Sequence, residues 1–334
     1  MPFDLPLRCA TDGMAVVFAR RKPVKPQSMS NGLTAVHHRR ADIGGIDTFY
    51  REAGPADAPV LLLPHGYPGS SFVYRGLLAA LGVRWRLIAP DLPGFGYSAT
   101  PSPEEFAYTF DGYAGFLQAF VEELALSEYV LYLHDYGSQF GFRLALAAPD
   151  RVRGLIIQNG DIYADAFGPK YDFLTELWND PGPESRHRLA QHVSMEGFRS
   201  EFLGEVPDAM AARISPDLWT LHWTLMCTPQ RMANLIRLLE DQPSTLGWFP
   251  KEQQYLREQA PPTLIVWGVH DGYMPEQSAR AYTRDLPDVR LHLFDGGHWL
   301  LETHLAEVVP LADEFLAQVY GVDRRRLGAA TALR

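Results

Sequence analysis

Three side chains in this sequence have the types and the chain order needed for nucleophilic catalysis: Asp135, Asp271 and His298. Asp135 lies in LHDYGSQFG, where an apolar run typical of a buried strand gives way to a helical pattern. Gly137 lets the chain bend sharply there, and such a bend exposes the side chain at its tip. An aspartate before a helix is also a common N-cap, so this position alone leaves both interpretations open.

Asp271 and His298 also follow predicted strands, in WGVHDGYMP and FDGGHWLLE. Taken singly, the first fits an ordinary Asp-Gly turn and the second a packed loop histidine. The order nucleophile, acid, histidine along one sheet edge instead predicts a triad in which His298 links Asp135 to Asp271. Asp161, which follows another predicted strand, is a weaker candidate for the orienting acid.

The segments around these residues alternate between buried strands and helices. The predicted strands are residues 46–54, 59–66, 85–91, 129–135, 152–160, 263–268 and 289–297. The predicted helices are residues 110–126, 137–149, 276–286 and 305–320. This alternation predicts an α/β fold with a mostly parallel sheet and helices on both faces. Ligands bind such sheets beyond the carboxyl ends of the strands, where the three candidate residues should meet.

The alternation stops between residues 161 and 261, which are predicted to form a helical insertion that caps the site. That insertion holds four of the seven tryptophans: Trp178, Trp219, Trp223 and Trp248. We therefore expect a core made of residues 42–160 and 262–322. Residues 1–41 are expected to be a poorly ordered extension that is not a signal peptide, and residues 323–334 a frayed tail.

Composition restricts the partners that this chain would bind. Its 334 residues carry a formal net charge of −10, which argues against binding nucleic acids or anionic membranes. No apolar run reaches the roughly 18 residues that a membrane helix needs. Cys9 and Cys227 are far apart and lack metal-site spacing, which suits a reducing compartment. We expect a cytoplasmic protein without cofactor or metal, present as a monomer or a homodimer.

Several motifs resemble the epoxide hydrolase and haloalkane dehalogenase branch of the alpha/beta-hydrolase superfamily. They are PHGYPGS, DLPGFGYS, LHDYGSQFGFRLALAAPDRV, WGVHD and GGHWLLE, and the resemblance covers residues 42–160 and 262–320. It implies an alpha/beta-hydrolase fold with a helical cap. It also implies an oxyanion hole formed by the backbone N–H groups of Tyr67 and Tyr136, and a cis bond before Pro68. His65 is expected to be a scaffold hydrogen-bonder, not a catalyst.

An aspartate at the bend has a chemical consequence that a serine lacks. When a carboxylate attacks a saturated carbon it leaves an ester, which water can cleave, whereas a serine would leave an ether. His298 would activate the water, and Asp271 would hold the imidazole tautomer and stabilise its cation. The substrate would therefore carry a leaving group on sp3 carbon, as epoxides and alkyl halides do.

The leaving group separates the two chemistries. The resemblance implies cap tyrosine hydroxyls for an epoxide and tryptophan or asparagine N–H donors for a halide. Tyr67 and Tyr136 do not match the dehalogenase pattern, yet the insertion holds only three tyrosines. Tyr163 and Tyr171 begin the insertion, where they could reach a pocket, and Tyr255 falls in a segment expected to be mostly exposed. The proton donor therefore stays unassigned from sequence.

The favoured activity is hydrolysis of an epoxide to a diol through a covalent ester on Asp135. The alternatives are hydrolysis of a carbon–halogen bond and a non-hydrolytic role as a ligand-binding or pathway-specific member of the fold. The substrate is expected to be small and largely apolar, with water as co-substrate. Its expected contacts are Tyr163, Tyr171, Trp223 and Trp299.

Overall fold

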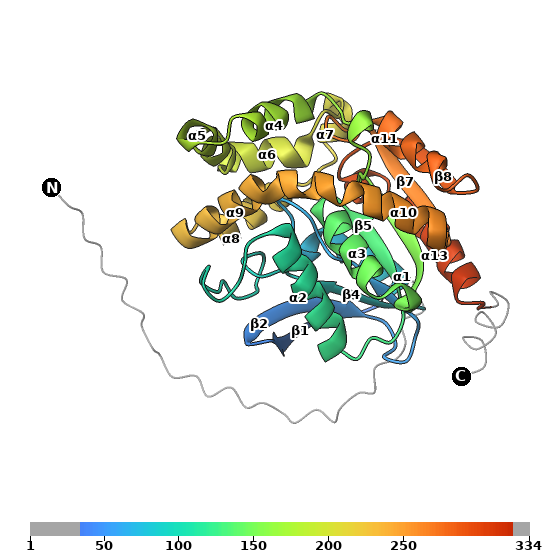
Figure 1. The fold of residues 1–334 in the computed structure, drawn as a ribbon. Coiled ribbons are helices and arrows are strands. Elements are labelled where there is room, and N and C mark those ends of the chain that lie inside the picture. The colour runs from blue at the N-terminus through green and yellow to red at the C-terminus, as the bar shows by residue number, and fades with distance from the viewer. Residues whose placement is uncertain (1–33, 323–334) are drawn as a thin grey trace, which may run out of the picture. The chain divides into compact units, whose positions relative to one another are not determined.

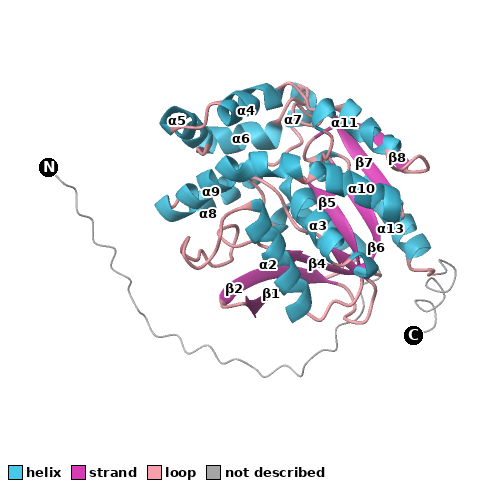
Figure 2. Ribbon diagram, in the orientation of Figure 1, coloured by secondary structure: helices cyan, strands magenta, loops and turns pink. Residues whose placement is uncertain are grey.

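A computed structural model describes residues 34–322, and within them the strands form a single sheet (Figure 2). The predictions for residues 1–33, Cys9 included, and for residues 323–334 lie outside the described residues. The strands are β1 (Val36–Ile43), β2 (Ile46–Ala53), β3 (Val60–Leu62), β4 (Arg86–Pro90), β5 (Tyr129–His134), β6 (Val152–Gln158), β7 (Thr263–His270) and β8 (Arg290–Gly297).

The sheet has the order β1-β2-β4-β3-β5-β6-β7-β8. Strand β2 is antiparallel to both of its neighbours, β1 and β4. Every other neighbouring pair is parallel. The predicted mostly parallel sheet is therefore confirmed, and the carboxyl ends of β5, β6, β7 and β8 lie along one edge.

The sheet begins earlier than the sequence predicted. Strand β1 starts at Val36, inside the segment expected to be a poorly ordered extension, and it pairs along its length with β2. It forms the edge of the sheet, and residues 37–40 are all exposed. An edge strand without a buried face lacks apolar alternation, so its sequence gave no strand signal.

Helices cover both faces of the sheet (Figure 1). They are α1 (Arg75–Leu81), α2 (Phe110–Glu123), α3 (Tyr136–Ala147), α10 (Phe249–Gln259), α11 (Glu276–Ala281), α12 (Leu300–Thr303) and α13 (Leu305–Val319). Helix α3 contacts α2 and α10, whereas α13 contacts α1 together with β6 and β7. Two separate apolar clusters result, one on each face of the sheet.

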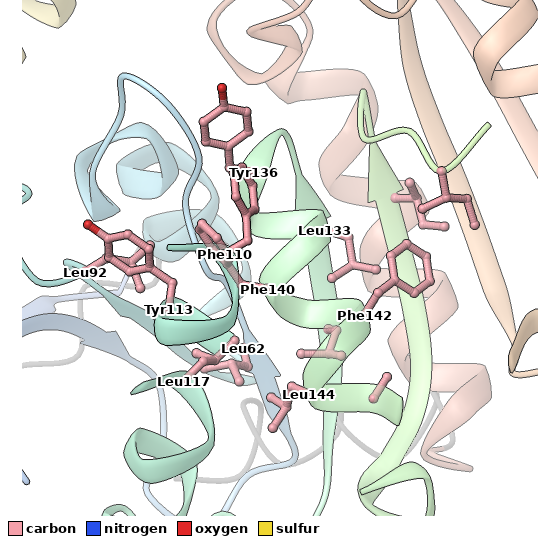
Figure 3. Close-up of a cluster of buried hydrophobic side chains, with 14 of the residues drawn as sticks. Leu62, Leu92, Phe110, Tyr113, Leu117, Leu133, Tyr136, Phe140, Phe142 and Leu144 are labelled. Carbon is pink, nitrogen blue, oxygen red and sulfur yellow. The ribbon is translucent and has the colours of Figure 1, made fainter. Parts of the chain in front are cut away.

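The cluster between α2 and α3 holds the helix that follows Asp135 against the sheet (Figure 3). Phe110 and Tyr113 on α2 meet Phe140 on α3, with ring centroids 5.4 and 5.2 Å from its ring. Phe140 is only 1% exposed. Apolar residues at helical spacing along α3 therefore fix the position of its N-terminus, where the candidate site begins.

The segment between β6 and β7 is helical, as predicted. It contains α4 (Lys170–Asn179), α5 (Pro183–His192), α6 (Met195–Leu203), α7 (Asp208–Ala211), α8 (Asp217–Met226) and α9 (Pro229–Asp241), followed by α10. In Figure 1, α4, α5 and α6 lie beyond the ends of the strands. Helix α10 instead packs against α3, with Tyr255 and Leu256 buried. The expectation that Tyr255 is exposed was therefore wrong, because α10 belongs to the helical layer over the sheet.

None of the helices within residues 34–322 has the length and apolar character needed to cross a membrane.

We predict that Phe140→Ala destabilises the protein by about 3–5 kcal/mol, because it opens a cavity between α2 and α3. Val83→Ala provides the control, since Val83 is 49% exposed and its truncation should cost less than about 0.5 kcal/mol. Urea unfolding followed by circular dichroism measures both changes. Equal midpoints for the two variants would contradict this account of how α3 is held.

Candidate active site

Asp135 is the single residue between β5 and α3, at a sharp turn of the chain. Its backbone has φ 52° and ψ −135°, a left-handed conformation that is costly for any residue with a side chain. Its N–H donates to the carbonyl of Asn159 (3.1 Å), and its carbonyl accepts from the N–H of Ser138 (2.9 Å). The side chain makes no capping hydrogen bond to α3, so the N-cap interpretation fails.

Two glycines allow other chain segments to approach this turn closely. A Cβ on Gly66 would lie 2.1 Å from Oδ1 of Asp135, and a Cβ on Gly137 would lie 2.2 Å from the backbone oxygen of Pro64. Neither contact is sterically allowed, so both positions need glycine. The HGYP loop therefore packs directly against the Asp135 side chain of the DYG motif.

The structure brings the three predicted triad residues together. His298 lies with Nδ1 2.7 Å from Oδ2 of Asp271 and with Nε2 3.4 Å from Oδ2 of Asp135. All three are buried, with exposures of 9%, 4% and 8% for His298, Asp271 and Asp135. A single imidazole therefore bridges two carboxylates away from bulk water, and Asp161 is not its partner.

The loop after β7 and an asparagine after β6 hold Asp271 in place. The N–H groups of Tyr273 and Met274 donate to Oδ1 of Asp271 at 2.9 and 3.0 Å. Nδ2 of Asn159 donates to Oδ2 at 2.9 Å. Burial alone would raise the pKa of Asp271, but the charge of His298 and these hydrogen bonds lower it. Asp271 is therefore an anchored carboxylate.

The two carboxylates control the protonation of His298. Burial by itself would lower the pKa of His298, but the charge of Asp271 and the hydrogen bonds to Asp135 and Asp271 raise it to about 10. The two carboxylates thus favour the imidazolium form of His298 in the resting site. Loss of the charge on Asp135 would remove part of that support.

Backbone donors lie beside the Asp135 carboxylate. The N–H of Tyr67 donates to Oδ1 of Asp135 at 2.5 Å, and the Tyr67–Pro68 peptide bond is cis, as expected. Tyr136 is the first residue of α3, and the first N–H groups of a helix have no partner within it. Of the expected oxyanion-hole pair, the N–H of Tyr67 thus contacts the carboxylate directly, and Tyr136 begins the helix next to it.

His65 has the scaffold position that the sequence predicted. Its Nδ1 lies 2.9 Å from the carbonyl oxygen of Gly66, and its Nε2 accepts from the N–H of Leu92 at 3.1 Å. It is completely buried and does not line the cavity described below. It therefore connects the HGYP loop to the chain after β4.

A cavity opens over Asp135 and His298, between the sheet edge and α4, α5, α6 and α9. Its apolar lining residues are Phe173, Leu174, Leu189, Leu239, Met274 and Trp299. Its other lining residues, besides Asp135 and His298, are Tyr67, Tyr136, Tyr171, His192, Glu201, Gln242 and Tyr273. The mainly apolar wall with a few polar groups is typical of small-molecule sites.

Two of the four expected substrate contacts are absent from this wall. Tyr171 and Trp299 line the cavity, but Tyr163 and Trp223 do not. The hydroxyl of Tyr163 donates to Asp285 at 2.6 Å, and its ring packs edge-on against Tyr282. Trp223 packs edge-on against Phe198, at 5.5 Å between ring centroids. Both predictions were wrong because tertiary packing decides the direction of a helical or loop side chain.

Sequence reasoning missed Asn159, Tyr273 and Glu201. Tyr273 lies two residues after Asp271, so a post-strand loop that supplies one site residue could have suggested it. Asn159 follows β6 at the same sheet edge. Glu201 on α6 had no such signal, because a helical glutamate usually faces solvent.

Comparison with known proteins agrees with this architecture. The family model described as "alpha/beta hydrolase fold" matches residues 59–305. An uncharacterized hydrolase from Saccharomyces cerevisiae is 32% identical over 294 residues, which span 86% of this chain and 98% of that protein. A haloalkane dehalogenase from Bradyrhizobium diazoefficiens is 42% identical over 182 residues, 53% of this chain and 56% of that protein.

Solved structures of two activities share the fold. A haloalkane dehalogenase from Bradyrhizobium elkani has a TM-score of 0.72 at 23% identity, covering 87% of this chain and 100% of its own. An epoxide hydrolase, CorEH, has a TM-score of 0.68 at 19% identity, covering 85% of this chain and 100% of its own. At these identities the likeness is one of fold and does not choose between the activities.

We predict that Asp271→Asn lowers the pKa of His298 by about 1–3, because burial remains while the neighbouring charge is lost. Asp161→Asn is the control: Asp161 is equally buried but does not contact His298, so the pKa of His298 should stay unchanged. Titration of 13C-labelled histidines by NMR measures both. An unchanged pKa in Asp271→Asn would contradict the electrostatic role given to that residue.

Proposed function

Because this chain belongs to the alpha/beta-hydrolase family, we propose that it hydrolyses an epoxide to a diol through an ester on Asp135. The observation that carries the proposal is the aspartate at the strained turn. It faces a buried cavity, with His298 and Asp271 aligned behind it. A small, largely apolar substrate fits the lining of that cavity.

In the first step, a carboxylate oxygen of Asp135 attacks a ring carbon of the epoxide. The carbon–oxygen bond of the ring opens, and the substrate becomes an alkyl ester of Asp135. The attack needs no base, because the nucleophile is an anion. The Tyr67 N–H on Oδ1 and the constrained backbone hold one carboxylate orientation, which lowers the entropic cost of reaching the reactive geometry.

In the second step, His298 takes a proton from water that attacks the ester carbonyl of Asp135. Formation of the ester neutralises Asp135, so the imidazole loses one of its two carboxylate partners and its pKa falls. The imidazolium then releases its proton to solvent, so the neutral imidazole becomes available as a base only after the ester has formed. Asp271 keeps the imidazole oriented and stabilises the cation that results.

The tetrahedral intermediate of this step carries negative charge on an oxygen of Asp135. The N–H groups of Tyr67 and Tyr136 are the proposed donors to it. Preorganised donors of this kind contribute on the order of 3 kcal/mol each to the rate. Collapse of the intermediate releases the diol and restores the carboxylate.

The polar groups of the cavity favour an epoxide over a halide. Four tyrosines line it, Tyr67, Tyr136, Tyr171 and Tyr273, and a tyrosine hydroxyl can protonate a leaving alkoxide. Of the tryptophans in the described chain, Trp299 alone lines the cavity, and its indole N–H donates to the backbone oxygen of Glu201 at 2.9 Å. No indole donor is therefore left to bind a halide.

Hydrolysis of a carbon–halogen bond is the second candidate. The favouring observation is similarity in sequence, since proteins named haloalkane dehalogenase align over 53% and 80% of this chain at 42% and 28% identity. The same aspartyl ester would form, with halide as the leaving group. The two candidates therefore differ in the first step and share the second.

We expect His298→Gln protein to accumulate the ester, because the second step loses its base and slows by about 10²–10⁴-fold. A panel of terminal epoxides and bromoalkanes, each incubated with this variant and followed by intact mass, identifies the substrate class. An epoxide adds its whole mass, whereas a bromoalkane adds only its alkyl group. Peptide mapping should place the added mass on Asp135.

The control is the double variant Asp135→Asn, His298→Gln, which should remain unmodified by every compound. Adducts from bromoalkanes alone would replace the epoxide proposal with the second candidate. No adduct in the His298→Gln variant and no turnover of any compound by the wild type would favour a non-hydrolytic role. Turnover that His298→Gln leaves intact, with no adduct, would show hydrolysis that does not pass through an ester on Asp135.

A further inference from the structure

A phenol and a carboxyl group lie hydrogen-bonded in the cavity wall and take no part in the triad. The hydroxyl of Tyr273 lies 3.0 Å from Oε1 of Glu201. Both side chains line the cavity together with Asp135 and His298. Tyr273 comes from the loop after β7, and Glu201 comes from α6. The pair therefore bridges the core and the helices above it at the place where the substrate would lie.

The backbone ties both members of this pair to the triad. The N–H of Tyr273 donates to Asp271 at 2.9 Å. The carbonyl of Glu201 accepts from the indole N–H of Trp299 at 2.9 Å, and Trp299 directly follows His298. The charges of His298 and Asp135 both act on the carboxyl group of Glu201. The pair is thus held at a fixed position beside the reacting groups.

A lysine connects the same carboxyl group with the outer surface. Nζ of Lys170 on α4 lies 3.9 Å from Oε2 of Glu201 and 2.9 Å from Oε1 of Glu205. The ammonium group also lies over the ring of Tyr273, 4.6 Å from its centroid. The side chain of Glu201 is 15% exposed and that of Glu205 is 42% exposed. Lys170, whose side chain is 28% exposed, and Glu205 therefore link the carboxyl group of Glu201 to groups at the surface.

Two other cavity tyrosines, Tyr136 and Tyr171, lack such a connection. The hydroxyl of Tyr136 donates to the amide oxygen of Gln242 at 2.8 Å, and an amide does not supply a proton. The hydroxyl of Tyr171 lies 3.5 Å from Oδ1 of Asp161, a residue that is only 3% exposed. Among the cavity tyrosines, Tyr273 is hydrogen-bonded to a carboxyl group that reaches toward solvent.

Resting on the epoxide-opening function proposed above, we propose that Tyr273 protonates the leaving oxygen and that Glu201 resupplies the proton to Tyr273. As the Asp135 oxygen bonds to the ring carbon and the ring carbon–oxygen bond breaks, the hydroxyl proton of Tyr273 passes to that oxygen. The proton of the Glu201 carboxyl group passes to the phenol oxygen. Tyr273 would touch the substrate, and Glu201 would act through it as a positioning residue.

The proton returns during hydrolysis. Water attacks the ester carbonyl, and His298 accepts its proton and hands it to the departing diol oxygen. Asp135 is left as a carboxylic acid, which ionises, and the released proton restores Glu201 through solvent beside Lys170 and Glu205. Once Asp135 is charged again, His298 takes back from solvent the proton that it released when the ester formed. One epoxide and one water thus give one diol, and every group of the site regains its starting state.

The electrostatics of Glu201 suit this role. Burial raises the pKa of Glu201, Asp135 adds to the increase, and Lys170, Tyr273 and His298 oppose it. The charged and titratable groups that face this carboxyl group are Lys170, Tyr273, His298, Asp135, Tyr67 and Tyr136, with Glu205 on the far side of Lys170. Because the protonated form is the active one, ester formation from an epoxide should slow as pH rises through the pKa of Glu201.

The test measures the rate of ester formation in the His298→Gln background by intact mass, from pH 5 to 9, with a terminal aryl epoxide and the matching bromoalkane. Adding Tyr273→Phe should slow the epoxide reaction by about 100-fold and change the bromoalkane reaction less than about 3-fold, because bromide needs no proton. Adding Glu201→Gln should abolish the decrease in the rate of ester formation at high pH, because the amide cannot ionise. Glu196→Gln, an exposed change on the same helix, is the matched control and should leave the pH profile unchanged.

The outcomes separate this inference from the proposed function. Adduct formation from the epoxide at an unchanged rate in Tyr273→Phe would overturn the proton relay while the ester mechanism stands. Equal slowing with epoxide and bromoalkane would also overturn it, because that is the result of a purely structural role. If the bromoalkane does not react, the pH profile of the epoxide reaction decides. A rate of ester formation that still falls at high pH in Glu201→Gln would overturn the proton relay. No epoxide adduct in the parent variant would refute the proposed function and the relay together.

Discussion

The imidazole of His298 lies between two buried carboxylates, 2.7 Å from Asp271 and 3.4 Å from Asp135, and the proposed chemistry depends on this arrangement. Two anions around one imidazole favour its protonated form, which cannot act as a base. Neutralising Asp135 by ester formation weakens that preference. In the proposed mechanism this electrostatic arrangement sets the order of the two steps: Asp135 reacts while it is charged, and His298 becomes available as a base once that charge is gone.

The core and the helices above it contribute different parts of the site. The sheet fixes the triad, because Asp135, Asp271 and His298 all follow strands that end at one edge. The helices between β6 and β7 supply much of the cavity wall, including Glu201 and most of its apolar residues. In the proposed mechanism the core therefore supplies the triad and the proton donor Tyr273, whereas the helices between β6 and β7 restrict which substrate fits and supply Glu201.

Much of the fold and the triad could be predicted from the sequence, because each depends on local patterns. Apolar runs marked the buried strands, and the turns after them marked Asp135, Asp271 and His298. Strand β1 was not predicted from the sequence, because an exposed edge strand has no apolar face. Tyr163, Trp223 and Tyr255 were misplaced for a related reason. The direction in which a side chain points depends on contacts between distant segments, such as Tyr163 with Asp285, and no local pattern records them.

Glu201 is another residue whose position at the candidate site could not be predicted from local sequence patterns. Its helix has an ordinary sequence, and only the packing of α6 against the loop after β7 brings its carboxyl group to Tyr273 and the cavity. Residues that hold the reacting groups in place, such as Asn159, were equally invisible, because their role is defined by a hydrogen bond across 112 positions of the chain.

The central claim is that the oxygen delivered to the substrate comes first from Asp135. A single turnover of an epoxide by excess wild-type enzyme in 18O-labelled water tests it directly, with mass analysis of both the diol and the peptide containing Asp135. The account predicts unlabelled diol and one 18O atom in the Asp135 carboxylate, because water attacks the ester carbonyl. Labelled diol with an unlabelled Asp135 peptide would show that water attacks the epoxide itself, and would contradict the covalent mechanism.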